Sequence, residues 1–337
     1  MKYYSENIEK NTKYRQSYKE SIDKFLEKEK QNADIKRSLF INPDLCYKNQ
    51  KHYRKKLIEL LGFPLNKKNL KGISVQTIFV AEDGNVDIYR KVFSIDGIEF
   101  YGIYFKQKED FSKKPFALCF HGGWGTPEII SSIYDDSSNY NHLARRLTDK
   151  GFSVFCPQLL LWNIDKYGNK YDRQEIDSKL RQLGGSITAL ELWLIKNTLN
   201  YFIKNEQINK DEIYSIGLSY GGMYALNYSA IDERVKGCYA SSQFNDRFKY
   251  SWSDWSYKNA LNQISDVEVA SLVCPRKLCI SLGNKDEVFN YEYAKKGLEE
   301  VKKYYSKFNA NDNYLIDIFD GTHETSKNNN CIDFLLK

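Results

Sequence analysis

The segment EIYSIGLSYGGMYALNYSA, at residues 212–230, decides the fold. Its first part, residues 212–217, is a short run of β-branched and aromatic residues that predicts a buried strand. Its last part, residues 220–230, predicts a helix. Between them, Gly217-Leu218-Ser219-Tyr220-Gly221 fits the pattern G-x-S-x-G. A tight turn between strand and helix lifts the serine hydroxyl clear of the backbone, so we expect Ser219 to be a nucleophile.

Strand and helix patterns alternate from Pro115 to the C terminus. Short apolar runs predict strands at residues 116–120, 152–156, 212–217, 235–240, 277–283 and 314–319. Helices are predicted at residues 139–149, 189–205, 220–230, 291–305 and near the C terminus. This alternation predicts an α/β fold with a mainly parallel central sheet and helices on both faces. Functional side chains in such sheets gather at the carboxyl ends of the strands.

The N-terminal third has a different pattern. Residues 75–105 hold three β-rich runs separated by DGN and DG turns, so we expect the sheet to open with antiparallel strands. Residues 1–74 are polar and predict helices, one of them with an apolar stripe and a second at residues 52–61. We expect residues 1–74 to form a helical extension, either a lid or an oligomerisation arm. Residues 75–337 then form the α/β domain.

Two more residues complete a nucleophilic site. His323 is the only one of four histidines that follows a predicted strand downstream of Ser219. Asp286 follows the preceding strand, and Glu287 and Asp320 are its competitors. A carboxylate holds an imidazole in the tautomer that accepts the serine proton. The order serine, aspartate, histidine is the one expected on such a sheet, so we predict a triad of Ser219, Asp286 and His323.

The segment His121-Gly122-Gly123-Trp124-Gly125 ends the strand at residues 116–120. Glycines leave backbone N–H groups uncovered, so a substrate oxygen can approach them. We predict an oxyanion hole made by the amides of Tyr220 and Gly123, with Trp124 as the neighbouring alternative. His121 is a second candidate base, but we expect it to anchor this loop by hydrogen bonding.

Two segments are predicted to shape a pocket, residues 158–187 and residues 241–262, because both are rich in aromatic residues. Large aromatic side chains line ligand pockets, and they also fill cores. These aromatics could therefore contact substrate or pack against the N-terminal helices. The candidate substrate contacts are Trp162, Phe244, Trp252 and Trp255.

Composition excludes several other functions. The 50 basic and 44 acidic residues are dispersed, so nucleic-acid binding is not expected. No stretch approaches the ~20 apolar residues of a membrane span, and the N terminus lacks the apolar run of a signal peptide. The seven cysteines show no metal-ligand spacing, and we expect Cys119, Cys156, Cys238 and Cys279 to act as small apolar side chains. We therefore predict a cytoplasmic protein without metal or cofactor.

From about residue 75 onward, the chain resembles serine hydrolases of the α/β-hydrolase superfamily, in particular dienelactone-hydrolase-like and acetyl-xylan-esterase-like enzymes. The resemblance rests on the HG-x-x-G loop, the strand FSVFCPQ, the G-x-S-x-GG turn and residues 230–235. It implies hydrolysis of a small-molecule ester, such as an acylated sugar or metabolite, through an acyl-enzyme. Many relatives have Asp, Arg and Gly where this chain has residues 159–163, LLLWN. A C–C hydrolase, thioesterase, peptidase or non-catalytic receptor therefore stays open.

Overall fold

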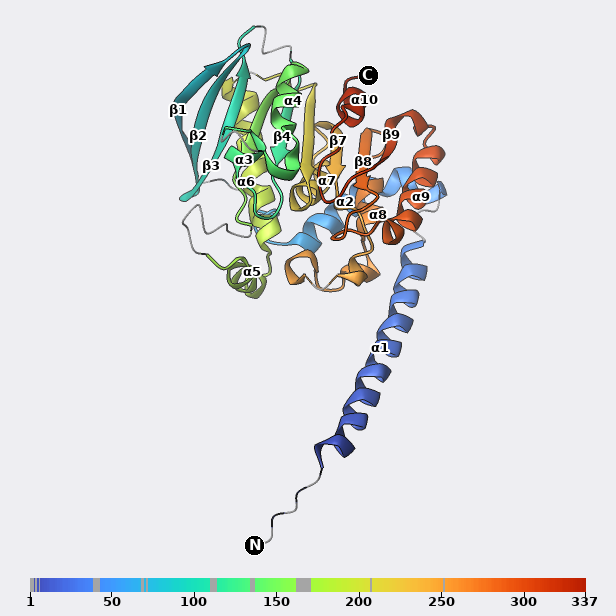
Figure 1. Cartoon of the computed structure of the whole chain (residues 1–337). Coiled ribbons are helices and arrows are strands. Elements are labelled where there is room, and N and C mark those ends of the chain that lie inside the picture. Colours follow the sequence, from blue (N-terminus) through green and yellow to red (C-terminus); the bar gives the residue numbers. More distant parts are fainter. Residues whose placement is uncertain are drawn as a thin grey trace.

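The computed structural model describes residues 3, 5, 7–38, 43–67, 70, 72–109, 114–133, 137–161, 171–206, 208–250 and 252–337, with backbone alone for 43–48. Its centre is a nine-stranded sheet in the order β1-β2-β3-β5-β4-β6-β7-β8-β9 (Figure 1). The strands are β1 (Ile73–Asp83), β2 (Val86–Ile95), β3 (Ile98–Gln107), β4 (Phe116–Phe120), β5 (Ser153–Pro157), β6 (Ile213–Leu218), β7 (Val235–Ser241), β8 (Lys277–Gly283) and β9 (Tyr314–Phe319).

The sheet has an antiparallel part and a parallel part. β1, β2 and β3 pair antiparallel, and β3 joins β5 in the same sense. From β5 to β9 all neighbours are parallel. Both parts of the sheet prediction are confirmed, and β4, β8 and β9 have the predicted bounds.

Helices cover both faces of the sheet. One core is shared with α2 (Pro43–Leu61), α6 (Ile187–Tyr201), α7 (Tyr220–Ile231), α8 (Asp266–Ser271) and α9 (Tyr291–Lys307). The core on the other face includes α3 (Pro127–Ile130), α4 (Leu143–Asp149) and α10 (Asn330–Leu336). Successive residues of a strand enter opposite cores: Phe116, Leu118 and Phe120 enter the first, Ala117 and Cys119 the second. Burial on both faces explains why these strands are continuous apolar runs.

The two N-terminal helices behave differently. α2 packs into the core through Leu57 and Leu61, and the Arg54 guanidinium donates to the carbonyls of Ala230 and Leu272 at 2.9 and 2.7 Å. By contrast, α1 (Ile8–Ser38) projects away from the sheet (Figure 1). Among the described residues, its last turns contact the rest of the chain, for example through Lys30 with Asp246 at 3.3 Å.

The pocket-shaping segments contain short elements that the sequence patterns did not predict. Residues 158–187 include α5 (Arg173–Gln182). Asp172 caps its N terminus, because the Asp172 side chain accepts from two backbone amides of the first turn. The described part of residues 241–262 contains three short 3₁₀ turns, at Arg247–Lys249, Ser253–Trp255 and Ala260–Asn262. Neither segment has a sustained apolar period, so sequence patterns predict no element there. Contacts with the rest of the chain hold these short elements in place.

Candidate active site

Ser219 lies on a strained turn between β6 and α7. Its φ and ψ are 57° and −122°, and its N–H donates to the Ser241 carbonyl at 2.8 Å. Neighbouring backbones leave no room for side chains. A Cβ on Gly217 would lie 2.3 Å from the Gly221 oxygen, and one on Gly221 would lie 2.0 Å from the Phe120 oxygen. The glycines of the G-x-S-x-G pattern are therefore required sterically, and strain of this kind clusters at functional sites.

Asp286 and His323 lie side by side at the ends of β8 and β9. The Nδ1 of His323 lies 2.9 Å from Oδ2 of Asp286. The other oxygen, Oδ1, accepts from the amides of Val288 and Phe289 at 2.8 and 2.9 Å, so the carboxylate has a fixed orientation. Its side chain is inaccessible to solvent. In the neutral imidazole, donation from Nδ1 leaves Nε2 as the acceptor, the tautomer that a base for serine needs.

The competing acids point elsewhere. Glu287 is exposed, and Asp320 pairs with Lys285 at 2.7 Å on the surface. The side-chain hydrogen bond from Lys285 lowers the pKa of Asp320. Asp286 is thus the one of the three predicted acids that contacts the His323 ring.

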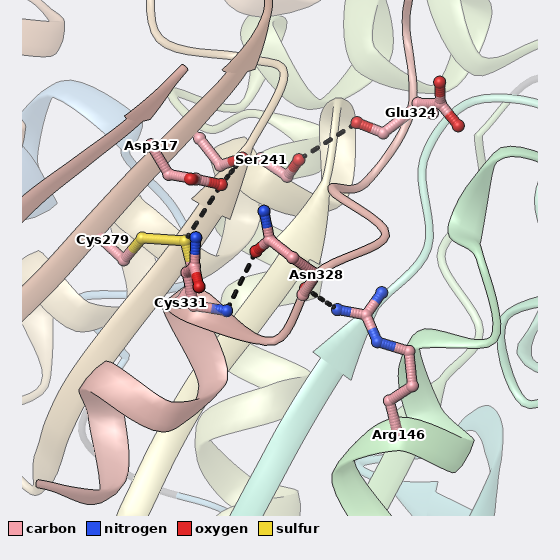
Figure 2. The surroundings of a disulfide bond; sticks show 9 residues. Arg146, Ser241, Cys279, Asp317, Glu324, Asn328 and Cys331 are labelled. Atoms are coloured by element: carbon pink, nitrogen blue, oxygen red, sulfur yellow. Dashed lines mark hydrogen bonds between the residues drawn. A yellow bond between two sulfur atoms is a disulfide. The ribbon is translucent and has the colours of Figure 1, made fainter. Parts of the chain in front are cut away.

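The loop that carries His323 is anchored along its length. Asn139 donates to the His323 carbonyl at 2.9 Å, and the Ser241 hydroxyl donates to the Glu324 carbonyl at 3.3 Å. Figure 2 shows the Ser241 contact and, beyond it, a contact between Arg146 and Asn328. Because the Ser241 carbonyl also accepts from Ser219, this one residue joins the nucleophile turn to the histidine loop.

A disulfide between Cys279 and Cys331 ties α10 to β8, with a Cα–Cα distance of 5.8 Å (Figure 2). The prediction that Cys279 acts as a small apolar thiol is therefore wrong. Packing of α10 on the sheet brings Cys331 to Cys279 of β8, 52 positions away in the sequence, and cysteine spacing alone does not reveal such a pair. Cys119, Cys156 and Cys238 are buried free thiols, as predicted.

The glycine-rich loop after β4 touches the nucleophile turn. A Cβ on Gly122 would lie 3.1 Å from the Cβ of Ser219, and the Gly122 N–H donates to the Tyr140 hydroxyl at 2.8 Å. Gly123 follows, and Trp124 has a φ of 62° and is 57% exposed. The predicted oxyanion residues therefore belong to two adjoining turns.

His121 is fully buried and anchors this loop. Its Nδ1 lies 2.9 Å from the Gly122 carbonyl, and its Nε2 accepts from the Leu159 amide at 2.9 Å. Burial lowers the pKa of His121 to about 4, and Arg173 acts in the same direction. The imidazole is thus neutral with both nitrogens engaged, which confirms the predicted anchoring role.

Aromatic rings surround the His323 side of the site. Phe289 stacks on the His323 ring with centroids 5.6 Å apart, and Trp255 stacks on Phe289 at 5.3 Å. Trp252 lies edge-on to Phe289 at 5.6 Å, and Trp255 lies edge-on to Tyr220 at 4.5 Å. We call these rings the aromatic cluster: Tyr220, Tyr250, Trp252, Trp255 and Phe289.

The four predicted substrate contacts have different placements. Trp252 is half-buried and Trp255 is buried, both within the aromatic cluster beside His323. Phe244 is 1% exposed and lines a cavity of about 620 Å³ under α1, whose described lining does not include the three triad candidates. Trp162 lies outside the described residues.

Sequence patterns missed several residues around Tyr220. Phe289 follows Asp286 by three positions, and its proximity to a catalytic candidate was a usable signal. Arg173, Glu191 and Asp254 form a buried ionic cluster, and their separation of up to 81 positions left no sequence signal. Within the described ranges, no group of three or more His, Cys, Asp and Glu side chains could hold a metal ion. None of the helices described there is long and apolar enough to cross a membrane.

A mainly parallel sheet, a serine on a strained turn and a histidine–aspartate pair at the strand ends are the features of an α/β-hydrolase. The chain belongs to the dienelactone hydrolase family, whose model matches residues 103–311.

The individual proteins that resemble this chain have low sequence identity to it. YtaP of Bacillus subtilis (strain 168), named as a hydrolase, is 24% identical over 279 residues, which cover 78% of this chain and 90% of YtaP. A structure from Bacteroides fragilis, titled as an acetyl xylan esterase, has a TM-score of 0.67 at 15% identity and covers 82% of this chain and 76% of its own. A glucuronoyl esterase from Solibacter usitatus has a TM-score of 0.63 at 12% identity, with 87% and 91% covered. These similarities establish the fold.

Proposed function

We propose that the enzyme hydrolyses a sugar ester through an acyl-enzyme on Ser219, with His323 as base and Asp286 as its orienting acid. The observation that carries the proposal is the fixed hydrogen bond of 2.9 Å between Asp286 and Nδ1 of His323. It leaves Nε2 as the proton acceptor, on a loop that Ser241 joins to the serine turn. A bound metal or organic cofactor has no part in the proposed steps.

The reaction has two halves. In the first, His323 takes the Ser219 proton as the oxygen attacks the ester carbonyl, and the amides of Tyr220 and Gly123 stabilise the oxyanion. The C–O bond to the alcohol then breaks, and His323 returns the proton to that alcohol. In the second half, water loses a proton to His323 and attacks the acyl-enzyme. Ser219 leaves with that proton, and the carboxylic acid is released.

The aromatic cluster supports a sugar as part of the substrate. Trp252 is half-buried beside Tyr220 and Phe289, so part of an indole is accessible next to the residue that follows the nucleophile. Aromatic faces bind the apolar C–H faces of sugar rings while their polar edges stay hydrated. The structural neighbours titled as acetyl xylan and glucuronoyl esterases act on esters of carbohydrates by name, which supports the same substrate class here.

Serine variants test this proposal directly. Ser219→Ala should lower kcat on p-nitrophenyl acetate by roughly 10⁴-fold or more, because the variant lacks the hydroxyl that is proposed to form the acyl-enzyme. Ser215→Ala is a matched control: Ser215 is also a buried serine of β6, and its hydroxyl donates to the Ala225 carbonyl at 3.1 Å. The control should stay within a few fold of the parent. Full activity of Ser219→Ala would refute the proposed nucleophile.

A substrate panel tests the bond and the sugar. Acetylated xylo-oligosaccharides, p-nitrophenyl esters, thioesters, peptides and diketones should be compared at equal concentration. The proposal predicts the highest kcat/KM on acetylated sugars. Preferred cleavage of a diketone or a peptide would contradict it and favour the C–C hydrolase or peptidase alternatives.

We also propose that α1 pairs with a second copy of the chain. Tyr18, Ile22 and Phe25 lie on one side of this helix and are 70%, 39% and 61% exposed. An isolated helix has little stability in water, so an apolar stripe on a projecting helix favours a partner. Light scattering on the full chain should give a dimer or larger assembly, and Phe25→Glu should dissociate it. A monomer at high concentration would refute this proposal.

The predicted cytoplasmic location is a proposal as well. The four buried free thiols among the described side chains fit a reducing compartment, whereas the Cys279–Cys331 bridge is typical of oxidising ones. Immediate alkylation of protein extracted into denaturant, which exposes the buried thiols without reducing a disulfide, decides between them. Seven alkylated cysteines would support the cytoplasm, and five, which is seven minus the bridged pair, would contradict it.

A further inference from the structure

A buried ionic cluster lies beneath the nucleophile turn. The Arg173 guanidinium binds Asp254 through Nε at 2.7 Å and Glu191 through Nη1 at 3.2 Å. All three residues are no more than 4% exposed. They come from α5, from the 3₁₀ turn Ser253–Trp255 and from α6, so the cluster joins both pocket-shaping segments to the sheet domain.

Two tyrosines of α7 complete the cluster. The Tyr220 hydroxyl donates to both oxygens of Asp254 at 3.0 and 3.1 Å. The Arg173 Nη2 donates to the Tyr224 hydroxyl at 3.0 Å, and Tyr224 in turn donates to Glu191. Burial, together with the Asp254 carboxylate, raises the pKa of Tyr220, so its hydroxyl stays protonated and keeps donating.

Burying these charges is costly. Taking each ion out of water costs several kcal/mol, and packed apolar residues of the same volume are often at least as stable. Two carboxylates and one guanidinium also leave a formal charge of −1 in the interior. Stability alone therefore explains the cluster poorly. A better explanation is that the cluster fixes the position of Tyr220, whose hydroxyl donates to Asp254.

We infer that Asp254 and Arg173 are positioning residues for the oxyanion hole. This inference rests on the proposed function. Tyr220 follows Ser219 directly, and its amide is one of the two proposed oxyanion donors. Its ring is held on three sides: by the Asp254 carboxylate, by the edge-on Trp255 at 4.5 Å and by the Arg173 guanidinium at 5.4 Å from the ring centre.

Fixing the ring fixes the peptide that carries the donor. Ser219 has a strained backbone, so the peptide between Ser219 and Tyr220 requires support from its neighbours to keep its direction. Displacing a reacting group by 1 Å can cost roughly 10²-fold in rate. A looser Tyr220 should therefore lower the rate for every acyl substrate, because each passes through the same oxyanion.

The alternative role is that the cluster only supports the pocket wall. Asp254 lies between Trp252 and Trp255 in the chain, so its loss could move those indoles instead. The two roles predict different substrate dependences. Oxyanion positioning acts equally on small and bulky acyl groups, whereas a wall defect acts on bulky ones alone.

The main test compares Tyr220→Phe with Tyr228→Phe, each of which removes one buried hydroxyl from α7. Tyr228 is the matched control, because its hydroxyl donates to Asp232 at 2.9 Å two turns further along the helix. Both variants should be assayed on p-nitrophenyl acetate and p-nitrophenyl hexanoate, with active sites counted by a fluorophosphonate. Tyr220→Phe should lower kcat per active site about 10-fold on both esters, with KM within twofold. Tyr228→Phe should keep kcat within twofold.

Asp254 gives a second, independent series. Asp254→Asn keeps an oxygen that accepts from Tyr220, whereas Asp254→Ala removes it, so kcat should fall in the order parent, Asn, Ala. Equal kcat for Tyr220→Phe and Tyr228→Phe, or a loss confined to the hexanoate, would overturn the inference. Failure of the fluorophosphonate to label the parent enzyme at Ser219 would instead overturn the proposed function, so the two failures are distinguishable.

Discussion

The buried imidazole of His121 should make the folded state sensitive to acid. In the folded protein burial lowers its pKa to about 4, and the charge of Arg173 acts in the same direction, against the opposite effect of the hydrogen bond to the Gly122 carbonyl. In the unfolded chain an imidazole has a pKa of about 6.5. As the pH falls below 6.5, the unfolded state binds a proton that the folded state does not, and stability is lost until both states are protonated below about 4.

The magnitude follows from the difference in pKa. At about 1.36 kcal/mol per pKa unit, a difference of about 2.5 units corresponds to about 3 kcal/mol in full. Between pH 8 and pH 5 the His121 share of this loss is about 2 kcal/mol. Carboxylates also titrate in acid, so the effect of His121 must be isolated by a variant.

His121→Gln is that variant, because the amide oxygen can still accept from the Leu159 N–H but does not titrate. Urea unfolding followed by tryptophan fluorescence should be measured at pH 8, 6.5 and 5 for both proteins. The parent should lose about 2 kcal/mol more than the variant between pH 8 and pH 5. An equal loss in both proteins would refute the reasoning that burial keeps this imidazole neutral.

Three further variants test the site. Asp286→Asn should lower kcat by roughly 10⁴-fold in activity assays, because the His323 imidazole loses the correct tautomer. The control Glu287→Gln, at the exposed neighbour, should keep the parent kcat. A small loss of kcat in Asp286→Asn would contradict the pairing of Asp286 with His323. Gly221→Ala should lower the melting temperature and activity because the added Cβ would lie 2.0 Å from the Phe120 oxygen, whereas Gly72→Ala, with open space, should do neither. Trp252→Ala should raise KM about 10-fold on acetylated sugars, and an unchanged KM would contradict sugar stacking.

The sequence patterns predicted the parallel sheet because its strands are buried on both faces and therefore form uninterrupted apolar runs. β4 and β8 have the predicted bounds for this reason. β9 also has the predicted bounds, although it is an edge strand whose residues are mostly half-buried. Asp286 and His323 could be predicted because each lies within four positions of the end of a predicted strand, and the structure brings their side chains to 2.9 Å.

The pocket-shaping segments were less predictable. α5 is polar, and contacts such as the ion pair of Arg173 with Asp254, 81 positions away, hold it in place. Residues 241–262 change direction at their 3₁₀ turns, so nearby aromatic residues lie in different parts of the molecule. Phe244 lines the cavity under α1, whereas Trp252 lies in the aromatic cluster. Neither arrangement has a period that a sequence can reveal.

Mapping the residue that a fluorophosphonate modifies tests the central claim most directly. Peptide mass spectrometry of the labelled enzyme should find the phosphonyl group on the peptide carrying Ser219, and the label should vanish in His323→Ala, since without the imidazole the serine is not activated. Stoichiometric labelling of another residue, or none of a fully active enzyme, would contradict the assignment of Ser219 as nucleophile.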